Sequence, residues 1–179
     1  MSAVTERREG ALTTATATLH PVAKYALVIL RFVLAFNFLW AFFDKTFGWG
    51  KATPSAKAWI HGGSPSGGFL KGVSGPLKGF YNPMSGNTFI DILFMVGLLG
   101  CGLALAFGVG LRVVAVLGGL LYLMMWGASL PIATNPIFDE HWTEGIATFA
   151  IAWANVGGIW GLGKWWASKP IVQKYGWLR

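Results

Sequence analysis

Four long apolar runs take up much of the chain, and they constrain its fold more than any other feature. The runs cover residues 22–43, 88–107, 112–130 and 141–162 of the 179. An α-helix rises about 1.5 Å per residue, so about 20 apolar residues cross the roughly 30 Å hydrocarbon core of a bilayer. The sequence therefore predicts an all-α integral membrane protein, a bundle of four transmembrane helices.

The composition excludes an ordinary water-soluble domain. Hydrophobic residues make up 54% of the chain and charged residues 12%, whereas soluble domains carry about 25% charge. A net charge of +7 alone would suit nucleic acid, but ten tryptophans and the apolar runs favour lipid as the partner. Cys101 is the single cysteine and no cysteine–histidine ligand pattern is present, so we expect no metal site and no covalently bound cofactor. No nucleic-acid-binding motif supports the basic charge, so we expect no nucleic-acid partner.

The remaining segments divide the chain into three parts. Residues 1–20 are polar and predict a flexible tail, residues 21–162 form the membrane domain, and residues 163–179 mix lysine with tryptophan as an interfacial segment would. Only residues 108–111 separate the second and third runs, which predicts two antiparallel helices joined by a tight turn.

Residues 44–87 form a long loop between the first two predicted helices. Thr53-Pro54-Ser55 is typical of a helix start, and Gly62-Gly63 of a helix end, so a short helix is expected there. Apolar residues further along the loop would lie across the mouth of the bundle or in the lipid interface. A loop without internal structure is the alternative.

Basic residues predict the orientation of the chain. Four crossings place both termini on one side, and that side would carry eight lysines and arginines against five in the loop of residues 44–87. The positive-inside rule then predicts cytoplasmic termini, an extracytoplasmic loop and a prokaryotic plasma-membrane location.

Acidic residues gather at the opposite ends of the predicted helices. Five of the seven acids lie there: Asp44, Asp91, Asp139, Glu140 and Glu144. Two explanations are open. The carboxylates either cap helix N-termini, or they line an outward-facing polar pocket, with Lys45 and His141 as their partners.

His141, Glu144 and Asp91 are the candidate catalytic residues. His141 and Glu144 are three positions apart and so share one helix face, and histidine titrates near neutrality. Such a group would relay protons to a bound quinone or to a reduced substrate, with Trp40 and Trp126 forming walls of the pocket. An inert polar cap is the alternative.

Arg31 lies deep inside the first run, where a bare guanidinium is costly. One explanation is snorkelling of its side chain to the cytoplasmic headgroups. The other is a buried polar contact near Asn155 and Cys101, which would bind the head of an anionic or carbonyl-bearing ligand. Asn37 is the other polar residue far inside this run, and it joins the candidate binding residues.

The spacing Gly157-x-x-x-Gly161 permits close helix contact. It predicts either packing within the bundle or the seam of a homo-oligomer.

The segment Arg31-Phe-Val-Leu-Ala-Phe-Asn-Phe38-Leu-Trp-Ala-Phe-Phe-Asp-Lys45 resembles the first-helix signature of the DoxX-like membrane proteins. These are relatives of the DoxD and DoxX subunits of thiosulfate:quinone oxidoreductase. Arg31, Phe38 and Lys45 match that pattern, whereas Ala35 and Phe42 stand where it has glycine. The stretch from Asn135 to His141 is also similar, and the resemblance covers about residues 22–166.

The resemblance implies a small prokaryotic membrane subunit of quinone-linked redox or sulfur metabolism that works with other redox subunits. It points to Arg31 and Lys45 first, with Asp44 and His141 beside them. Three functions follow, in order of expectation. They are a quinone-binding subunit of an oxidoreductase, a noncatalytic scaffold or assembly subunit, and a small-solute carrier.

Overall fold

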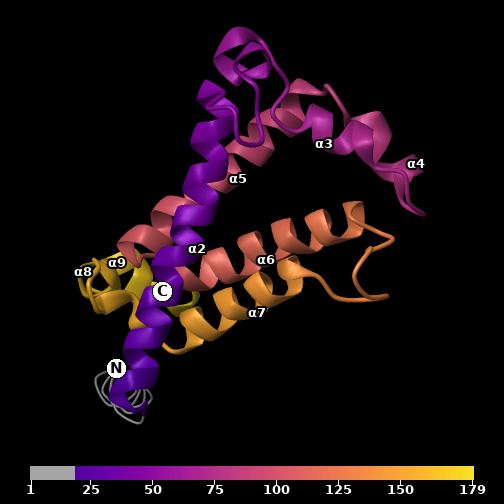
Figure 1. The fold of residues 1–179 in the computed structure, drawn as a ribbon. Helices are drawn as coiled ribbons and strands as arrows, with labels where there is room; N and C mark the ends of the chain where they lie inside the picture. The colour runs from indigo at the N-terminus through magenta and orange to yellow at the C-terminus, as the bar shows by residue number, and fades with distance from the viewer. Residues whose placement is uncertain (1–18) are drawn as a thin grey trace.

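The computed structural model describes residues 19–179, and the regular elements of this part are all helical (Figure 1). Three helices are long and apolar enough to cross a membrane: α2 (Pro21–Phe47), α5 (Thr88–Phe107) and α6 (Leu111–Ala128). Many of their apolar side chains point outward, as lipid contact requires. An all-α protein with membrane-length helices is thus confirmed.

The fourth predicted span is too long. Helix α7 (Glu140–Trp153) has 14 residues, and its length of about 21 Å falls short of the hydrocarbon core. It ends because Asn155 adopts a left-handed conformation with φ 52°, and the 3-10 turn η4 (Val156–Gly158) follows. Within residues 19–179, therefore, three helices reach membrane length instead of the predicted four.

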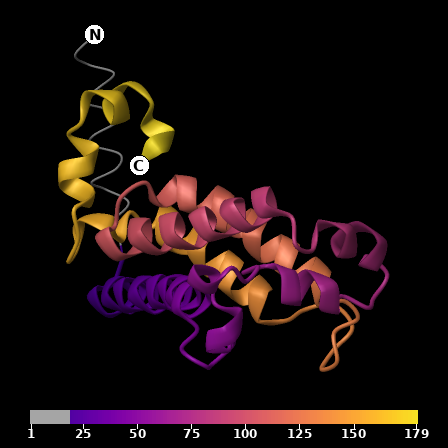
Figure 2. The same ribbon diagram turned by 90° about the horizontal axis from the view of Figure 1, so that it is seen from above.

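The helices form two pairs. Helix α2 packs along α5, and α6 packs along α7 (Figure 2). An apolar core is shared by all four helices. Helices α5 and α6 are the predicted antiparallel neighbours, since Gly108 and Gly110, with φ of 69° and 60°, make the tight turn between them. Figure 1 shows the two pairs diverging away from this turn.

The molecule thus has two ends. We call the end that holds residues 108–110 the turn end, and the opposite end, where α2 ends and α5 begins, the arm end. All five acidic residues of the described part lie in segments at the arm end: Asp44, Asp91, Asp139, Glu140 and Glu144. The ends of α2 and α5 lie together, whereas the start of α7 lies apart from them because the pairs diverge (Figure 1). The predicted convergence of three acidic helix ends is therefore not seen, and the side of the membrane on which they lie stays a prediction.

Residues 48–87 fold into an arm over the diverging pairs. The helix expected over residues 55–61 is instead two 3-10 turns, η1 (Ser55–Lys57) and η2 (Trp59–His61). They are followed by three short elements: α3 (Gly67–Gly72), α4 (Lys78–Tyr81) and η3 (Asn82–Met84). A loop without internal structure is excluded.

The arm is fastened to α6 by Tyr81. Its buried hydroxyl donates a hydrogen bond to the carbonyl of Met124 at 2.8 Å. Burial raises the pKa of Tyr81 above its ordinary value, which keeps the hydroxyl protonated as a donor. The arm consequently spans from α2 and α5 to the far end of α6.

The C-terminal segment folds back onto the turn end through α8 (Gly163–Ala167), α9 (Pro170–Lys174) and the 3-10 turn η5 (Gly176–Leu178). The backbone N–H of Arg112 donates to the carbonyl of Arg179 at 2.7 Å, and the Arg112 guanidinium donates to the carbonyl of Gly176 at 3.1 Å. An interfacial position stays a prediction, and residues 1–18 of the predicted tail lie outside the described residues.

Gly157 and Gly161 pack inside the molecule. A Cβ on Gly157 would lie 2.3 Å from the carbonyl oxygen of Gly108, and one on Gly161 would lie 2.5 Å from that of Gly157. These glycines permit a close backbone approach within one chain, which favours packing within the bundle over an oligomer seam at this pair.

Candidate ligand-binding site

Arg31 supports the fold at the turn end. It is fully buried, and its Nη1 donates to the carbonyl of Gly157 at 3.2 Å while Nη2 donates to those of Ile159 and Trp160 at 3.1 and 3.0 Å. These carbonyls follow the last turn of α7, where helical partners run out. Snorkelling is therefore excluded, and Asn155, which is exposed, is not among the hydrogen-bond partners of Arg31.

Asp44 and Asp91 hold the arm. Both carboxylates are buried. Asp44 accepts hydrogen bonds from the backbone N–H groups of Lys51 and Ala52 at 3.3 and 3.1 Å. Asp91 accepts two from Ser66, from the backbone N–H at 2.9 Å and from the hydroxyl at 2.6 Å. These two predicted site residues thus serve to fix the arm to the ends of α2 and α5.

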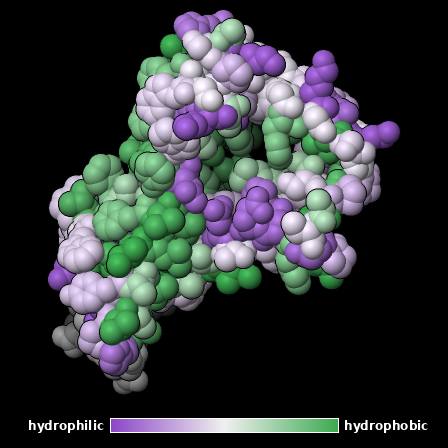
Figure 3. All heavy atoms as spheres, viewed as in Figure 1, coloured by the Kyte–Doolittle hydropathy of each residue, from purple (hydrophilic) through white to green (hydrophobic). Residues whose placement is uncertain are grey.

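The other predicted residues come together in a cleft of about 340 Å³ beneath the arm. Figure 3 shows the hollow between the arm and the α6–α7 pair, with hydrophilic residues gathered on its lower border. Five of its lining residues were predicted: Asn37, Trp40, Lys45, His141 and Glu144. Seven others complete the lining: Phe38, Ala41, Phe69, Phe94, Leu98, Tyr122 and Met125. We call this cavity the cleft.

Charged and amide groups cross the cleft from α2 to α7. Asn37 Nδ2 donates a hydrogen bond to Glu144 Oε1 at 2.9 Å, which links the two diverging pairs. Lys45 Nζ lies 5.7 Å from the centroid of the Phe94 ring. In the part of the chain that the structure describes, Lys45 has no carboxylate oxygen within 4.0 Å. Its ammonium group is therefore free to bind a ligand oxygen.

His141 is oriented by Asp139. The Asp139 side chain caps α7 by accepting from the backbone N–H of His141 at 3.1 Å, and its second oxygen lies 2.8 Å from His141 Nδ1. A carboxylate at Nδ1 fixes the ring and leaves Nε2 for a different partner. Of the two explanations offered for the acidic residues, capping thus applies to Asp139, and pocket formation applies to Glu144.

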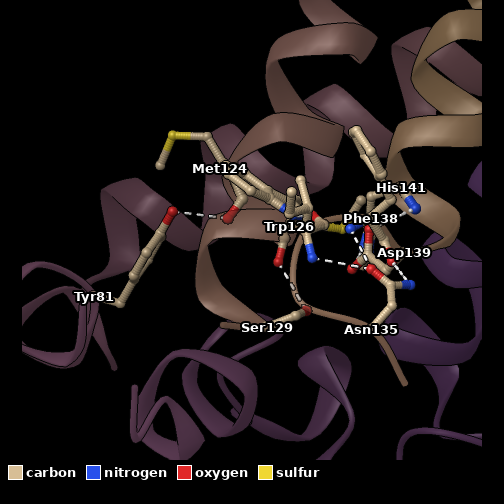
Figure 4. A network of polar contacts seen from close by, with 10 residues as sticks. Tyr81, Met124, Trp126, Ser129, Asn135, Phe138, Asp139 and His141 are labelled. Carbon is tan, nitrogen blue, oxygen red and sulfur yellow. Dashed lines mark hydrogen bonds and ion pairs between the residues drawn. The ribbon is translucent and has the colours of Figure 1, made fainter. Parts of the chain in front are cut away.

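The α6–α7 loop places Asp139 at the start of α7 (Figure 4). The Asn135 side-chain oxygen accepts from the backbone N–H groups of Ile137 and Phe138, and its nitrogen donates to the carbonyl of Phe138. Trp126 Nε1 donates to the carbonyl of Ile137 at 2.7 Å. Trp126 therefore shapes this loop and, contrary to expectation, does not line the cleft.

Tyr122 is a cleft residue that the sequence reading missed. Only 3% of it is exposed. Its hydroxyl makes no hydrogen bond within 3.5 Å among residues 19–179, and the carboxylate that faces it from α7 is that of Glu144. Leaving a buried hydroxyl unpaired costs about 1–3 kcal/mol, so such a group marks a place for a ligand or a water. A signal was present, because Tyr122 is the single hydroxyl in an otherwise apolar helix between Arg112 and Ala128.

A second cavity of about 460 Å³ lies between α6 and α7 and also includes Tyr122 and His141. We call it the groove. Its remaining lining residues are apolar or aromatic: Val116, Gly119, Leu120, Leu123, Trp126, Trp142, Gly145, Ile146 and Phe149.

Among residues 19–179, no group of three or more His, Cys, Asp or Glu side chains is placed to hold a metal ion. No protein-family model, curated protein or solved structure matches the chain. The geometry of the cleft therefore carries the functional argument.

Proposed function

We propose that the cleft binds a carbonyl-bearing redox compound, a quinone, and exchanges protons with it. The observation that carries this proposal is the unpartnered hydroxyl of Tyr122, buried in the same cleft as His141 and Lys45. A quinone carbonyl accepts hydrogen bonds, and these three side chains are donors that would otherwise be unsatisfied or solvated.

Proton exchange is assigned to His141. Reduction of a quinone to a quinol takes up two electrons and two protons. The electrons come from a partner enzyme that carries a flavin or a haem, and each proton passes from His141 Nε2 to a quinone oxygen. The ring is then reprotonated by water at the arm end. Asp139, 2.8 Å from Nδ1, stabilises the protonated ring.

The proposal includes membership of the DoxX-like family and a role in quinone-linked metabolism of sulfur compounds in a prokaryotic plasma membrane. Two residues that the resemblance singles out, Lys45 and His141, line the cleft. Arg31 and Asp44, which it also singles out, bind backbone groups, so their part is structural.

Binding of a short-chain ubiquinone to the purified protein in lipid nanodiscs tests the proposal. We expect Tyr122→Phe and His141→Gln each to weaken binding about tenfold, because one hydrogen bond of about 1–1.5 kcal/mol is lost. Tyr25→Phe and His61→Gln are matched controls, since both residues lie outside the cleft. Absence of saturable binding, or equal affinity in all four variants, would contradict the proposal.

A noncatalytic scaffold is the second candidate, favoured by the structural use of Arg31, Asp44 and Asp91. Isolation of the complex from native membranes separates the two functions. A redox enzyme that copurifies and keeps its quinone-dependent turnover in His141→Gln and Glu144→Gln would favour the scaffold. Loss of turnover in these variants, but not in Glu140→Gln, would favour quinone binding.

A further inference from the structure

The groove is an apolar channel on the outer side of the α6–α7 pair. Its rim is formed by exposed side chains, among them Leu123, which is 48% exposed, and Ile146, which is 63% exposed. Two glycines leave room in the groove because they have no side chain. A Cβ on Gly119 would come within 2.9 Å of the Phe149 ring, and one on Gly145 would reach Tyr122 at 3.8 Å.

The groove and the cleft meet at two residues. Tyr122 and His141 line both cavities. The two cavities therefore adjoin at these side chains, so a molecule whose polar head lay beside them in the cleft would have the groove next to it. Its remaining part would have to be apolar, because aliphatic and aromatic side chains form most of the groove wall.

The groove also has one unused donor. Trp142 Nε1 is buried without a hydrogen-bond partner in the described part of the chain, whereas Trp126 Nε1 is satisfied by the carbonyl of Ile137. The Trp142 ring packs against Trp126 and Phe138 at the start of α7. The Tyr122 hydroxyl, in a residue that is 97% buried, is the donor shared with the cleft, so the ligand's polar atoms are expected beside it.

We infer that the groove holds the single apolar chain of the ligand whose head occupies the cleft. The ligand is then a membrane-soluble compound with a carbonyl-bearing head and an isoprenoid or alkyl chain, and not a water-soluble carbonyl compound. This inference rests on the proposed function and narrows its substrate class.

The expected effect of the chain is moderate. A chain that moves from lipid into the groove leaves one apolar environment for another, so it gains packing contacts but little hydrophobic free energy. We therefore expect the groove to raise affinity several-fold.

The experiment compares two quinones with the same head, one with a long isoprenoid chain and one with a single isoprene unit, at equal mole fractions in the nanodisc lipid. Leu123→Trp and Ile146→Trp fill the groove from α6 and from α7. Both residues are exposed, so the substitutions leave the core intact. Leu117→Trp is the matched control, since Leu117 is 56% exposed and lies outside the groove.

We expect each groove variant to weaken binding of the long-chain quinone about fivefold and to leave binding of the short-chain quinone unchanged. Leu117→Trp should change neither. Equal loss for both quinones, or no loss for either, overturns the inference while the proposed function stands. If neither quinone binds the unsubstituted protein saturably, both fail.

A photoreactive diazirine on the long chain gives a readout that does not depend on variants. Crosslinks to peptides of α6 and α7 that unlabelled long-chain quinone displaces are expected. Crosslinks spread over all lipid-facing helices and not displaced would overturn the inference.

Discussion

The two ends of the molecule differ in how closely the chain packs around its buried polar groups. At the turn end, two nitrogens of the Arg31 guanidinium serve three backbone carbonyls while Nε has no partner among residues 19–179, and backbones approach so closely that Gly157 has no room for a Cβ. At the arm end, the helix pairs diverge, and Tyr122 and Trp142 keep buried donors without partners.

Buried donors without partners occur at both ends of the described part, but only at the arm end do such donors lie beside a cavity that a ligand could enter. A closely packed polar network fixes a structure, whereas an unsatisfied donor beside a cavity lowers stability unless something binds there. Substitutions at the turn end should therefore act on folding, and substitutions in the cleft on binding.

The largest expected effect is the loss of Arg31. Arg31→Ala leaves three carbonyls without their charged donor and should lower the free energy of unfolding by about 3–5 kcal/mol. Arg31→Lys should be nearly as harmful, because one ammonium group cannot reproduce the fork that reaches both Gly157 and Trp160.

Thermal unfolding in detergent measures this effect. Lys24→Ala is the control, since Lys24 is a half-buried cation on the same helix that makes no side-chain hydrogen bond within the described residues. Equal melting temperatures for Arg31→Ala and Lys24→Ala would remove the contrast between the two ends.

The glycines give the next effect. Gly157→Ala should destabilise the protein by about 1–3 kcal/mol, because its Cβ would collide with the carbonyl of Gly108. Gly100→Ala on α5 meets no atom within 4 Å, so it should be neutral or stabilise by up to about 1 kcal/mol through helix propensity. Chemical unfolding of the two variants side by side tests this, and equal stabilities would show that the turn end is not closely packed.

Substitutions of two tyrosines are expected to change the free energy of unfolding least. Tyr81→Phe removes the hydrogen bond to Met124 and should destabilise the arm by about 1 kcal/mol. Tyr122→Phe removes an unpartnered hydroxyl, so stability should stay equal or rise by about 1 kcal/mol while quinone affinity falls. Hydrogen exchange of the arm and ligand titration give the two readouts. A loss of stability in Tyr122→Phe equal to that in Tyr81→Phe would mean that the Tyr122 hydroxyl serves the fold.

Much of the fold could be predicted from local sequence. The apolar runs located α2, α5 and α6, and the short glycine-containing turn made α5 and α6 neighbours. The early end of α7 was missed because the apolar sequence continues past Trp153. The chain leaves the helix at Asn155, and the backbone carbonyls that follow accept hydrogen bonds from Arg31 on another helix.

The site was predicted only in part for a similar reason. Residue type and position brought out Asn37, Trp40, Lys45, His141 and Glu144, all of which line the cleft. The same criteria could not show that Asp44 and Asp91 bind the arm, because their partners lie in a segment without regular hydropathy. Tyr122 was missed because the hydroxyl of an isolated tyrosine in an apolar helix can find a hydrogen-bond partner in many ways, and the sequence does not show whether it does.

By itself the sequence determined the helical class, the length of three apolar helices and the gathering of acids at one end, since hydropathy and helix geometry act over a few neighbouring residues. Only the tertiary structure decided which polar groups find partners. Hydrogen bonds such as that from Arg31 to Gly157 join residues more than a hundred positions apart. Whether a donor remains free, as at Tyr122, follows from how the helix pairs diverge and where the arm covers them.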